Sequence, residues 1–482
     1  MLSLMILGLV AAVCAMVLTP VVCAICHRAG LVDRPDQRKL HRTAVPRLGG
    51  LVLAASYLAS FGALALLPAS TGAELVRQHR QMVLALAPAA VVVFAVGLLD
   101  DLFGLSPRFK LVFEALAASL AVMAGLSIGD SWWSAPLTVL WLVGTANAFN
   151  LIDGVDGLAT GVGLFATLTI LVAALVHGNY GLALATAPLA GCLAGFLRYN
   201  FEPASIFLGD SGSLTVGFLL GSFAVVWGYK STTAVGMTAP LILLFLPFLD
   251  VTLSIARRFL NMKPIFGADR GHIHHRLLAL GLRPRHVALL AYAACGLAAA
   301  VSMVQSNAPP VYGAFVVAAF ALLVWVAIAK LGYTEFRATY RALWNGQLRR
   351  AFRQEIVLDQ LRTELATARS EEECWDKLCH ASRELGLSQV LLRLGDRDRH
   401  AQWREIESAA SYQTRVPLRA GDYVAFTGHH ADPATAQLLL PLAAALRDAL
   451  APPPDGIRLP EPVARREAVS GIVIEKATNA VL

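Results

Sequence analysis

The sequence predicts an all-α polytopic membrane protein with about eleven transmembrane helices, followed by a small cytoplasmic α/β domain. The chain has 482 residues, of which 56% are hydrophobic and 15% are charged, whereas soluble chains carry about 25% charged residues. Residues 1–330 contain 20 Lys and Arg against 13 Asp and Glu, while residues 331–482 contain 20 of each. This composition excludes a disordered chain, an ordinary nucleic-acid binder and a single soluble domain.

A spanning helix needs about 20 mostly apolar residues. Eleven stretches are candidates, near 2–26, 48–68, 81–99, 109–127, 135–150, 157–177, 181–198, 212–228, 236–256, 286–305 and 311–330. The first lacks a cationic start and a clear small-residue cleavage motif, so it is predicted to be a retained helix. With the N-terminus outside, 16 Lys and Arg fall in inner loops and 3 in outer loops, which puts the inner loops in the cytoplasm.

The predicted domains are a transmembrane domain over 1–330, a helical linker over 331–385, a small α/β cytoplasmic domain over 386–450 and a flexible tail over 451–482. Strands are expected at Ser388–Leu394 and near 402–408 and 413–427, and a helix at Ala434–Leu450. No motif for catalysis or metal binding stands out after residue 330. The extension is therefore interpreted as a sensor-like or docking domain.

Nine of the 13 acids in residues 1–330 lie in predicted inner loops. A transporter tends to keep its ionisable groups near the middle of the bilayer, so this placement favours chemistry at the cytoplasmic membrane surface. Asp250, inside an apolar run, is expected to be solvated near that surface.

The loop after the third predicted helix contains adjacent carboxylates, Asp100 and Asp101. Two close acids raise each other's pKa unless a cation lies between them, and Mg²⁺ is the usual cation in phosphate chemistry. The alternative is a solvated acidic helix end.

The next inner loop contains four oxygen donors, Asn147, Asn150, Asp153 and Asp156. The spacing of three between the last three residues would place them on one face of a helical turn. The alternative is a turn rich in Asn and Asp that binds nothing.

Gly209-Asp-Ser-Gly-Ser213 precedes an apolar run. The backbone N–H groups at a helix N-terminus favour a phosphate, and Asp210 is either a Mg²⁺ ligand or the helix N-cap. The last inner loop contains Arg270 and three histidines, His272, His274 and His275. Arg and His together suit a pyrophosphate or sugar better than zinc, and a solvated basic loop is the remaining alternative.

Taken together, these loops resemble the polyprenyl-phosphate N-acetylhexosamine-1-phosphate transferase family over about residues 30–285. The motifs that carry the resemblance occur in the expected order: Asp100-Asp101 with Lys110 nine residues later, Asn147-x-x-Asn150-x-x-Asp153-x-x-Asp156-Gly157, Asn200 ten residues before Asp210, and His272-Ile-His-His275.

The resemblance implies that a lipid phosphate, undecaprenyl phosphate, attacks the β-phosphate of a UDP-N-acetylhexosamine and that UMP leaves. This would be the first step of a cell-envelope polysaccharide, at the bacterial inner membrane with a cytoplasmic active site. Mg²⁺ is the implied cofactor, with Mn²⁺ as a substitute, and a homodimer is a further expectation. Membrane lipid is an expected partner and nucleic acid is not.

The resemblance also implies roles. Asp210 and Asn150 would bind the metal, Asp100 would act as the base, and Asp101 would shape the metal and diphosphate region. The substrate-binding residues would be Lys110 and Asn200 at the phosphates, Asp153 and Asp156 along the nucleotide, Asn147 beside them, and Arg270, His272, His274 and His275 at the diphosphate or sugar.

The His-Ile-His-His loop resembles the N-acetylglucosamine branch, because the phospho-N-acetylmuramoyl-pentapeptide branch has three consecutive histidines. UDP-N-acetylglucosamine is therefore the favoured donor. The muramoyl-pentapeptide activity and a lipid or nucleotide-sugar transporter are the alternatives, and a catalytically silent scaffold is a third.

Overall fold

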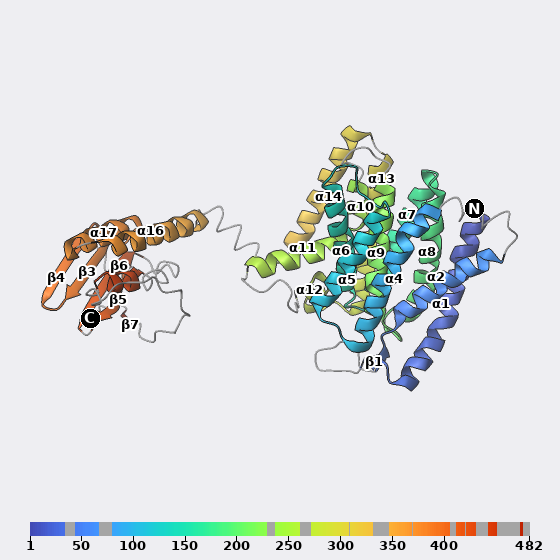
Figure 1. Cartoon of the computed structure of the whole chain (residues 1–482), viewed down its shortest axis with the longest axis horizontal. Helices are drawn as coiled ribbons and strands as arrows, with labels where there is room; N and C mark the ends of the chain where they lie inside the picture. Colours follow the sequence, from blue (N-terminus) through green and yellow to red (C-terminus); the bar gives the residue numbers. More distant parts are fainter. Residues whose placement is uncertain are drawn as a thin grey trace. The chain divides into compact units, whose positions relative to one another are not determined.

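The computed structural model describes residues 1–33, 44–66, 80–228, 237–260, 271–307, 309–330, 347–368, 370–404, 411–419, 421–429, 442–450 and 473–475. Within these residues the chain forms two compact units, Met1–Tyr333 and Thr334–Leu482. The first unit is a bundle of helices and the second combines helices with a sheet (Figure 1).

The first unit follows the predicted helices closely. Its elements are α1 (Leu2–Ala29), the short strands β1 (Val32–Asp33) and β2 (Val45–Pro46), α2 (Gly49–Ala65), α4 (Arg80–Phe103), α5 (Pro107–Met123), α6 (Ser134–Ile152), α7 (Leu158–Val176), α8 (Tyr180–Asn200), α9 (Gly209–Gly228), α10 (Thr238–Leu243), α11 (Phe245–Leu260), α12 (Ile273–Ala279), α13 (Pro284–Asn307) and α14 (Pro310–Lys330). Among the described residues, eight helices are long and apolar enough to cross a membrane.

Among the described residues, three of the eleven predicted spans do not meet this length and apolarity. Helices α2 and α5 have only 17 residues each. The predicted span near 236–256 is divided at Leu244 into α10 and α11. Pro247 has no N–H to donate to the carbonyl of Leu243, so one hydrogen bond of a continuous helix is missing at this point, which favours the division.

Glycines allow the helices to approach closely at two places. On α8, a Cβ at Gly191 or Gly195 would overlap the backbone of α1. On α9, Gly212 faces Gly50 of α2. Between membrane helices, packing of this kind replaces the hydrophobic driving force that holds a soluble core together, since the lipid is as apolar as the protein.

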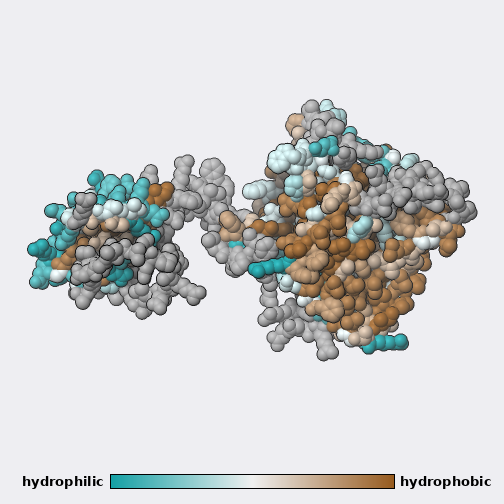
Figure 2. All heavy atoms as spheres, in the orientation of Figure 1, coloured by the Kyte–Doolittle hydropathy of each residue, from teal (hydrophilic) through white to brown (hydrophobic). Residues whose placement is uncertain are grey.

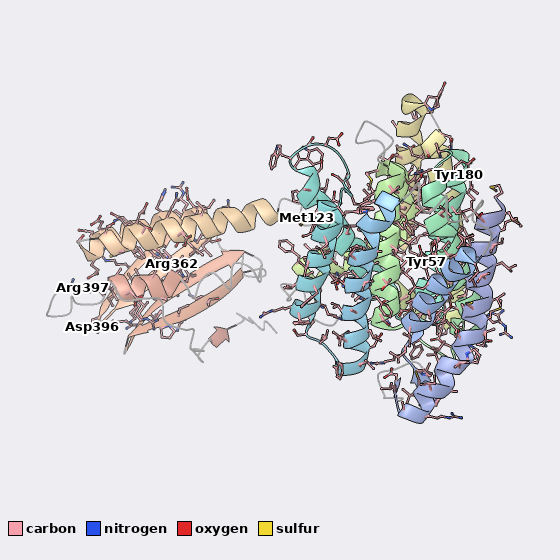
Figure 3. The ribbon with its side chains drawn as sticks, turned by 45° about the vertical axis from the view of Figure 1, so that its right-hand side comes forward. Tyr57, Met123, Tyr180, Arg362, Asp396 and Arg397 are labelled. Atoms are coloured by element: carbon pink, nitrogen blue, oxygen red, sulfur yellow. The ribbon has the colours of Figure 1, made fainter. Side chains whose placement is uncertain are left out.

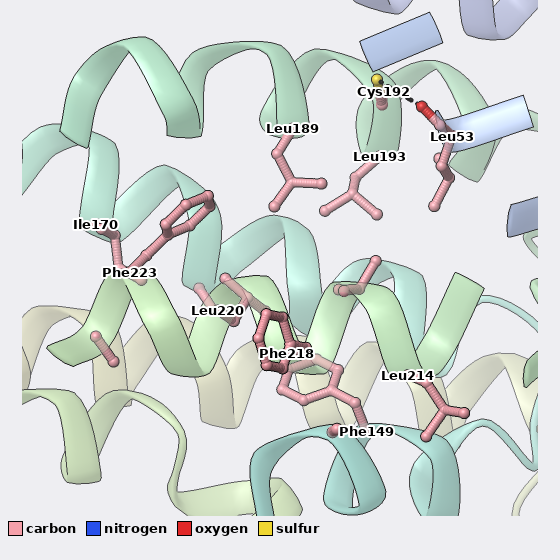
Figure 4. Close-up of a cluster of buried hydrophobic side chains, with 14 of the residues drawn as sticks. Leu53, Phe149, Ile170, Leu189, Cys192, Leu193, Leu214, Phe218, Leu220 and Phe223 are labelled. Carbon is pink, nitrogen blue, oxygen red and sulfur yellow. Dashed lines mark hydrogen bonds between the residues drawn. The ribbon is translucent and has the colours of Figure 1, made fainter. Parts of the chain in front are cut away.

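Helix α9 lies at the centre of the bundle and packs against α2, α4, α6, α7 and α8. Its side chains Leu214, Phe218 and Phe223 are at most 1% exposed. They pack with Phe149 of α6 and Leu193 of α8 (Figure 4). The dense core around α9 holds the first residues of that helix in a fixed position.

Buried polar groups in the bundle bond to backbone carbonyls of neighbouring helices. The Tyr57 hydroxyl donates to the carbonyl of Ala185 at 3.0 Å, and Tyr57 lies inside the bundle in Figure 3. The thiol of Cys192 donates to the carbonyl of Leu53 (Figure 4). A polar group without a partner is costly in an apolar environment, so these bonds stabilise the contact of α2 with α8.

The surface of the first unit is largely apolar on the face shown in Figure 2, whereas the described surface of the second unit is mostly hydrophilic. The difference matches the composition, because all eight helices among the described residues that are long and apolar enough to cross a membrane belong to the first unit.

The second unit contains α16 (Gln347–Thr367), α17 (Glu371–Glu384) and the strands β3 (Gln389–Leu394), β4 (Arg397–Gln402), β5 (Ser411–Arg419), β6 (Asp422–His429) and β7 (Val473–Glu475). The strands form one antiparallel sheet in the order β4-β3-β6-β5-β7. Asp396 and Arg397 mark the turn between β3 and β4 (Figure 3).

The structure adds three details to the predicted second unit. Leu361 of α16 and Leu378 of α17 share a buried cluster with Val390 and Phe426 of the sheet, so these two helices pack against the sheet. The strand expected over 413–427 is a hairpin of β5 and β6. β7 lies within the predicted tail and pairs with β5.

Candidate functional site

The predicted site residues lie at helix ends that meet at one end of the first unit. They come from the end of α4, the start of α5, the end of α6 and the turn after it, the end of α8, the start of α9, and the segment that begins α12. Arg270 lies outside the described residues.

Lys110 joins two predicted carboxylates. Its Nζ donates to Asp100 Oδ2 at 2.8 Å and to Asp210 Oδ2 at 2.6 Å. The side chains are partly accessible, at 19% for Lys110, 14% for Asp100 and 27% for Asp210. Ser106 caps α5 and Pro107 begins it, which places Lys110 one turn into the helix. This carboxylate centre, Asp100, Lys110 and Asp210, is therefore an ion-paired cluster open to solvent on one side.

Asp101 has a different environment from Asp100. Its Oδ1 accepts the backbone N–H of Asp210 at 2.8 Å, and its Oδ2 accepts the backbone N–H of Ser211 at 3.0 Å together with the Ser211 hydroxyl. Asp101 of α4 thus caps the N-terminus of α9, where a carboxylate is favoured. The two N–H groups expected to favour a phosphate are already bound to Asp101.

Gly209 makes this cap sterically feasible. It has a φ of 73°, which favours glycine. A Cβ at this position would overlap the carbonyl of Arg47 and approach the Asp101 carboxylate. The segment before α9 is held by β-like backbone bonds from the start of α2, in which Gly49 and Gly50 donate to the carbonyls of Phe207 and Leu208.

The two predicted asparagines of α6 have separate partners. Asn150 Nδ2 donates to Ser213 Oγ at 3.0 Å. Since Ser213 is three residues after Asp210 on α9, Asn150 lies one helical turn from the carboxylate centre. Asn147 Nδ2 donates to Glu114 of α5, a buried carboxylate that is 2% exposed.

The spacing predicts that Asn150, Asp153 and Asp156 share one helical face. This prediction is wrong, because α6 ends at Ile152, before both aspartates. They lie in the turn before α7, which ends at Gly157 with a φ of 75°. Burial raises the pKa of Asp153 well above its usual range, and the nearby charges of Asp210, Asp101 and Asp156 raise it further. The turn therefore faces the carboxylate centre.

Two predicted substrate-binding residues, Asp156 and Asn200, bond to the chain around the loop between α8 and α9. Asp156 Oδ2 accepts the N–H of Ala204 at 2.9 Å. Asn200, which is 2% exposed, accepts from Thr160 at 2.6 Å and donates to the carbonyl of Ile206 at 2.9 Å. Both side chains hold the loop that leads from α8 into α9.

The histidine segment, His272–His275, lies against the same turn. A Cβ on Gly154 would lie 2.7 Å from His274 Nε2, so only glycine permits this approach. His274 is 4% exposed. Burial, together with the neighbouring His275 and His272, lowers its pKa to about 4 against the opposing effect of Asp250. The imidazole of His274 is therefore neutral near pH 7.

Asp250 is not solvated, contrary to the expectation from sequence. It is 2% exposed and accepts from His272 Nδ1 at 2.8 Å and from the N–H of Ile273 at 2.6 Å. Glu114 was likewise not predicted as part of the region. An ionisable residue inside an apolar helix is by itself a signal of a functional site, and that signal was available for both.

The oxygen donors fit Mg²⁺. Among the described side chains, no group of three or more His, Cys, Asp or Glu is placed to hold a metal ion. Mg²⁺ needs only one or two carboxylates, since it completes its shell with waters and substrate phosphates. The site supplies hard oxygen donors from Asp210, Asp100 and the amide of Asn150. The two carboxylates already hold one cationic group between them, the ammonium of Lys110.

An apolar pocket of about 500 Å³ adjoins the site. It lies between α2, α4, α8 and α9 and reaches Ser211 and Gly212, next to Asp210. Its lining suits a hydrocarbon chain rather than a polar ligand.

Two comparisons with known proteins, one with family models and one with individual sequences, agree on the family of this chain. Residues 83–228, which include the carboxylate centre and the turn before α7, match the model of "Glycosyl transferase family 4". The "Probable undecaprenyl-phosphate N-acetylglucosaminyl 1-phosphate transferase" of Bacillus subtilis is 36% identical over 304 residues, which cover 61% of this chain and 82% of the relative.

Two further relatives extend the comparison. The "Decaprenyl-phosphate N-acetylglucosaminephosphotransferase" of Mycobacterium tuberculosis is 33% identical over 364 residues, 67% of this chain and 89% of that protein. The "Undecaprenyl-phosphate alpha-N-acetylglucosaminyl 1-phosphate transferase" of Escherichia coli is 27% identical over 302 residues, 58% of this chain and 77% of that protein. The chain therefore belongs to glycosyl transferase family 4, in the group of polyprenyl-phosphate N-acetylhexosamine-1-phosphate transferases.

Proposed function

We propose that this chain transfers N-acetylglucosamine-1-phosphate from UDP-N-acetylglucosamine to undecaprenyl phosphate and releases UMP. The observation that carries the proposal is the carboxylate centre, in which Lys110 bridges Asp100 and Asp210 beside Asn150. Phosphoryl transfer depends mainly on positioning and on electrostatic stabilisation of the phosphates, and these residues supply both.

In the proposed reaction an oxygen of the lipid phosphate attacks the β-phosphorus of the UDP-sugar. The bond from this phosphorus to the oxygen that bridges the two phosphates breaks, and UMP leaves with that oxygen. Asp100 orients the attacking phosphate and accepts its proton if one is present. Lys110 donates to phosphate oxygens and balances their charge.

Asp210 and Asn150 would hold Mg²⁺, with Asp100 close by. When bound, the ion neutralises charge on the diphosphate and polarises its oxygens. Asp101 holds the first residues of α9, so the position of Asp210 in the site is fixed. Asp153 and Asp156 lie in the turn proposed to follow the nucleotide, and Asn147, which bonds to Glu114, is proposed to contact the substrate beside them.

His272, His274 and His275 are proposed to contact the diphosphate or sugar, together with Arg270. Neutral His274 suits this role, because an uncharged imidazole can accept a bond from a sugar hydroxyl and donate one to a phosphate. Asn200 would act on the phosphates through the loop that it braces between α8 and α9.

We further propose that the enzyme lies in the bacterial inner membrane with its active site facing the cytoplasm. The described ends that form the site carry Arg108, Lys110, Arg198 and Arg285, and the loops assigned to this side hold most of the Lys and Arg of residues 1–330. Cytoplasmic loops carry an excess of these residues. The product would be the first lipid-linked intermediate of a cell-envelope polysaccharide.

The test is an assay of the purified full-length chain with Mg²⁺, undecaprenyl phosphate and radiolabelled UDP-N-acetylglucosamine. We expect lipid-linked sugar and an equal amount of UMP, and no turnover after EDTA until Mg²⁺ is restored. Other UDP-N-acetylhexosamines, tested in parallel, define the donor. Failure with every donor would reject the proposal, and turnover that survives EDTA would reject the metal.

A further inference from the structure

Helix α11 has an unusual distribution of polar side chains. Asp250, Ser254, Arg257 and Arg258 are all at most 8% exposed, and their spacing of four, three and one places them on one helical face. On the opposite face Phe259 is 68% exposed. The helix therefore turns its charged residues towards the protein and its apolar residues outwards, which indicates that the polar face has a specific partner.

That partner is the start of the histidine segment. The two oxygens of Asp250 accept from His272 Nδ1 at 2.8 Å and from the N–H of Ile273 at 2.6 Å. Two turns further along α11, Arg257 Nη1 donates to the carbonyl of Gly271. A Cβ on Gly271 would overlap the guanidinium of Arg257, so the fit between the two is close. Three consecutive residues are thus held by α11.

The bond to Asp250 also fixes the chemistry of His272. A carboxylate only accepts hydrogen bonds, so Nδ1 of His272 carries the proton. The other nitrogen, Nε2, is then the one left to interact elsewhere, since the partner of one ring nitrogen sets the state of the other. His272 is 7% exposed and its ring stacks with that of His274, with centroids 5.6 Å apart.

The other side of the histidine segment contacts the turn before α7, which contains Asp153 and Asp156 and is called the catalytic turn below. His274 approaches Gly154 closely, and Gly154 follows Asp153, whose charge interacts with Asp210 and Asp101. The histidine segment is therefore enclosed between α11 and the turn before α7. A shift at α11 would be passed directly to the histidines.

We infer that Asp250 and Arg257 are positioning residues, which hold the histidine segment in register with the catalytic turn and fix the His272 tautomer. They act through the histidines and do not touch the substrate. This inference rests on the proposed transferase activity.

The test is a double-variant cycle in the transferase assay. We expect Asp250→Asn to lower kcat about 10- to 100-fold, by analogy with the loss of a hydrogen-bond partner of a metal-binding histidine, with the KM for undecaprenyl phosphate changed less than about 2-fold. If Asp250 acts through His272, the double variant Asp250→Asn/His272→Gln is no slower than His272→Gln alone. Multiplied losses in the double variant, or a wild-type kcat for Asp250→Asn, would overturn the inference.

Arg257 provides a second measurement that does not depend on the folding of the Asp250 variants. Arg257→Lys keeps a donor for the Gly271 carbonyl, so it should retain far more of kcat than Arg257→Gln, by about 10-fold. Equal losses in the two variants would count against positioning by this bond. Ile255→Ala, on the outward face of α11 at 43% exposure, is the matched control and should leave kcat unchanged.

The wild-type chain is assayed first, so the two proposals fail separately. If it forms no product with any UDP-sugar, the proposed function falls. The same cycle is then measured as the apparent Tm in detergent. Non-additive Tm losses for Asp250→Asn and His272→Gln would support the positioning contact, and additive losses would overturn it.

Discussion

The carboxylate centre and the histidine segment are held in place in opposite ways. In the carboxylate centre the partners are themselves predicted site residues, since Lys110 bonds to Asp100 and Asp210. In the histidine segment the hydrogen-bond partners lie on α11, outside the predicted site residues, and the segment also packs against the turn before α7. The first cluster is partly open, whereas His272 and His274 are at most 7% exposed.

This difference distinguishes residues that act in the reaction from residues that hold the reacting groups in position. A residue whose partners are other site residues can be replaced without disturbing the fold, so its loss should appear in the rate alone. A residue held by buried groups transmits changes in those groups, so distant substitutions should also alter the rate. The following predictions test that separation.

The largest effect is expected at Asp210. Asp210→Asn should lower kcat by roughly 10³-fold, comparable to the loss of a single electrostatic contact in other active sites. The reason is that Asp210 is both the proposed Mg²⁺ ligand and a partner of Lys110, and the substitution weakens both interactions. The measurement is UMP release by detergent-purified protein. Asp130→Asn, at an exposed acid between α5 and α6, is the control, and an Asp210→Asn variant with near-normal kcat would refute the centre.

The next effect concerns pH and His274. Its pKa falls from 6.5 to about 4 on folding, so the unfolded chain binds a proton below pH 6.5 while the folded chain does not. The free energy of unfolding is therefore unaffected by His274 above pH 6.5. It falls as the pH drops towards 4, by on the order of 3 kcal/mol.

The measurement is the apparent Tm between pH 7 and pH 4 in wild type and in His274→Gln. The variant should show a shallower decline, because it has no imidazole to protonate. The raised pKa of Asp153 acts in the opposite direction in both proteins, so it cancels in the comparison. Parallel pH profiles would contradict the assignment.

Asp100 and Asp101 should differ in stability although they are adjacent. Asp101→Asn should lower the apparent Tm, with a loss of about 1–2 kcal/mol typical of a removed helix cap, because both carboxylate oxygens accept N–H groups from α9. Asp100→Asn keeps an acceptor for the N–H of Leu105 and should keep the wild-type Tm while losing activity. Equal Tm values for the two variants would argue against the cap.

Gly154→Ala should lower kcat about 10-fold, since the new methyl group would lie 2.7 Å from His274 Nε2 and displace the histidine segment. A loss of about 1.4 kcal/mol in transition-state stabilisation corresponds to that factor. Gly144→Ala on α6 is the matched control, because its Cβ would make an ordinary contact 3.7 Å from Phe248. The contact matters to catalysis only if the two variants differ.

The smallest effect is expected from removal of residues 345–482. The second unit has its own buried cluster, and the similarity to the Bacillus subtilis relative covers 61% of this chain. The truncated protein should retain most of the transferase rate, measured in the same assay. A monodisperse but inactive truncation would show that the second unit contributes to the site.

The sequence anticipated much of the bundle because apolar length is a local property. All eleven predicted stretches correspond to helices of the first unit, and the motif residues Asp100, Lys110 and Asp210 meet as their shared chemistry suggested. The division at Leu244 does not show in the apolar length of the stretch, although Pro247 removes one backbone donor there. A single strand is predicted over 413–427, whereas Gly421, with a φ of 90°, lies at the turn between β5 and β6.

The sequence by itself determined the membrane-spanning character, the order of the helices and the identity of the polar residues at their ends, since these depend on composition and spacing along the chain. Only the tertiary structure decided which partner each polar residue has. Asp101 caps α9 and Asp250 holds His272, and neither follows from spacing, because each bond joins residues whose distance in space is set by helix packing. The physical reason is that a buried carboxylate must find a donor wherever the fold brings one within reach.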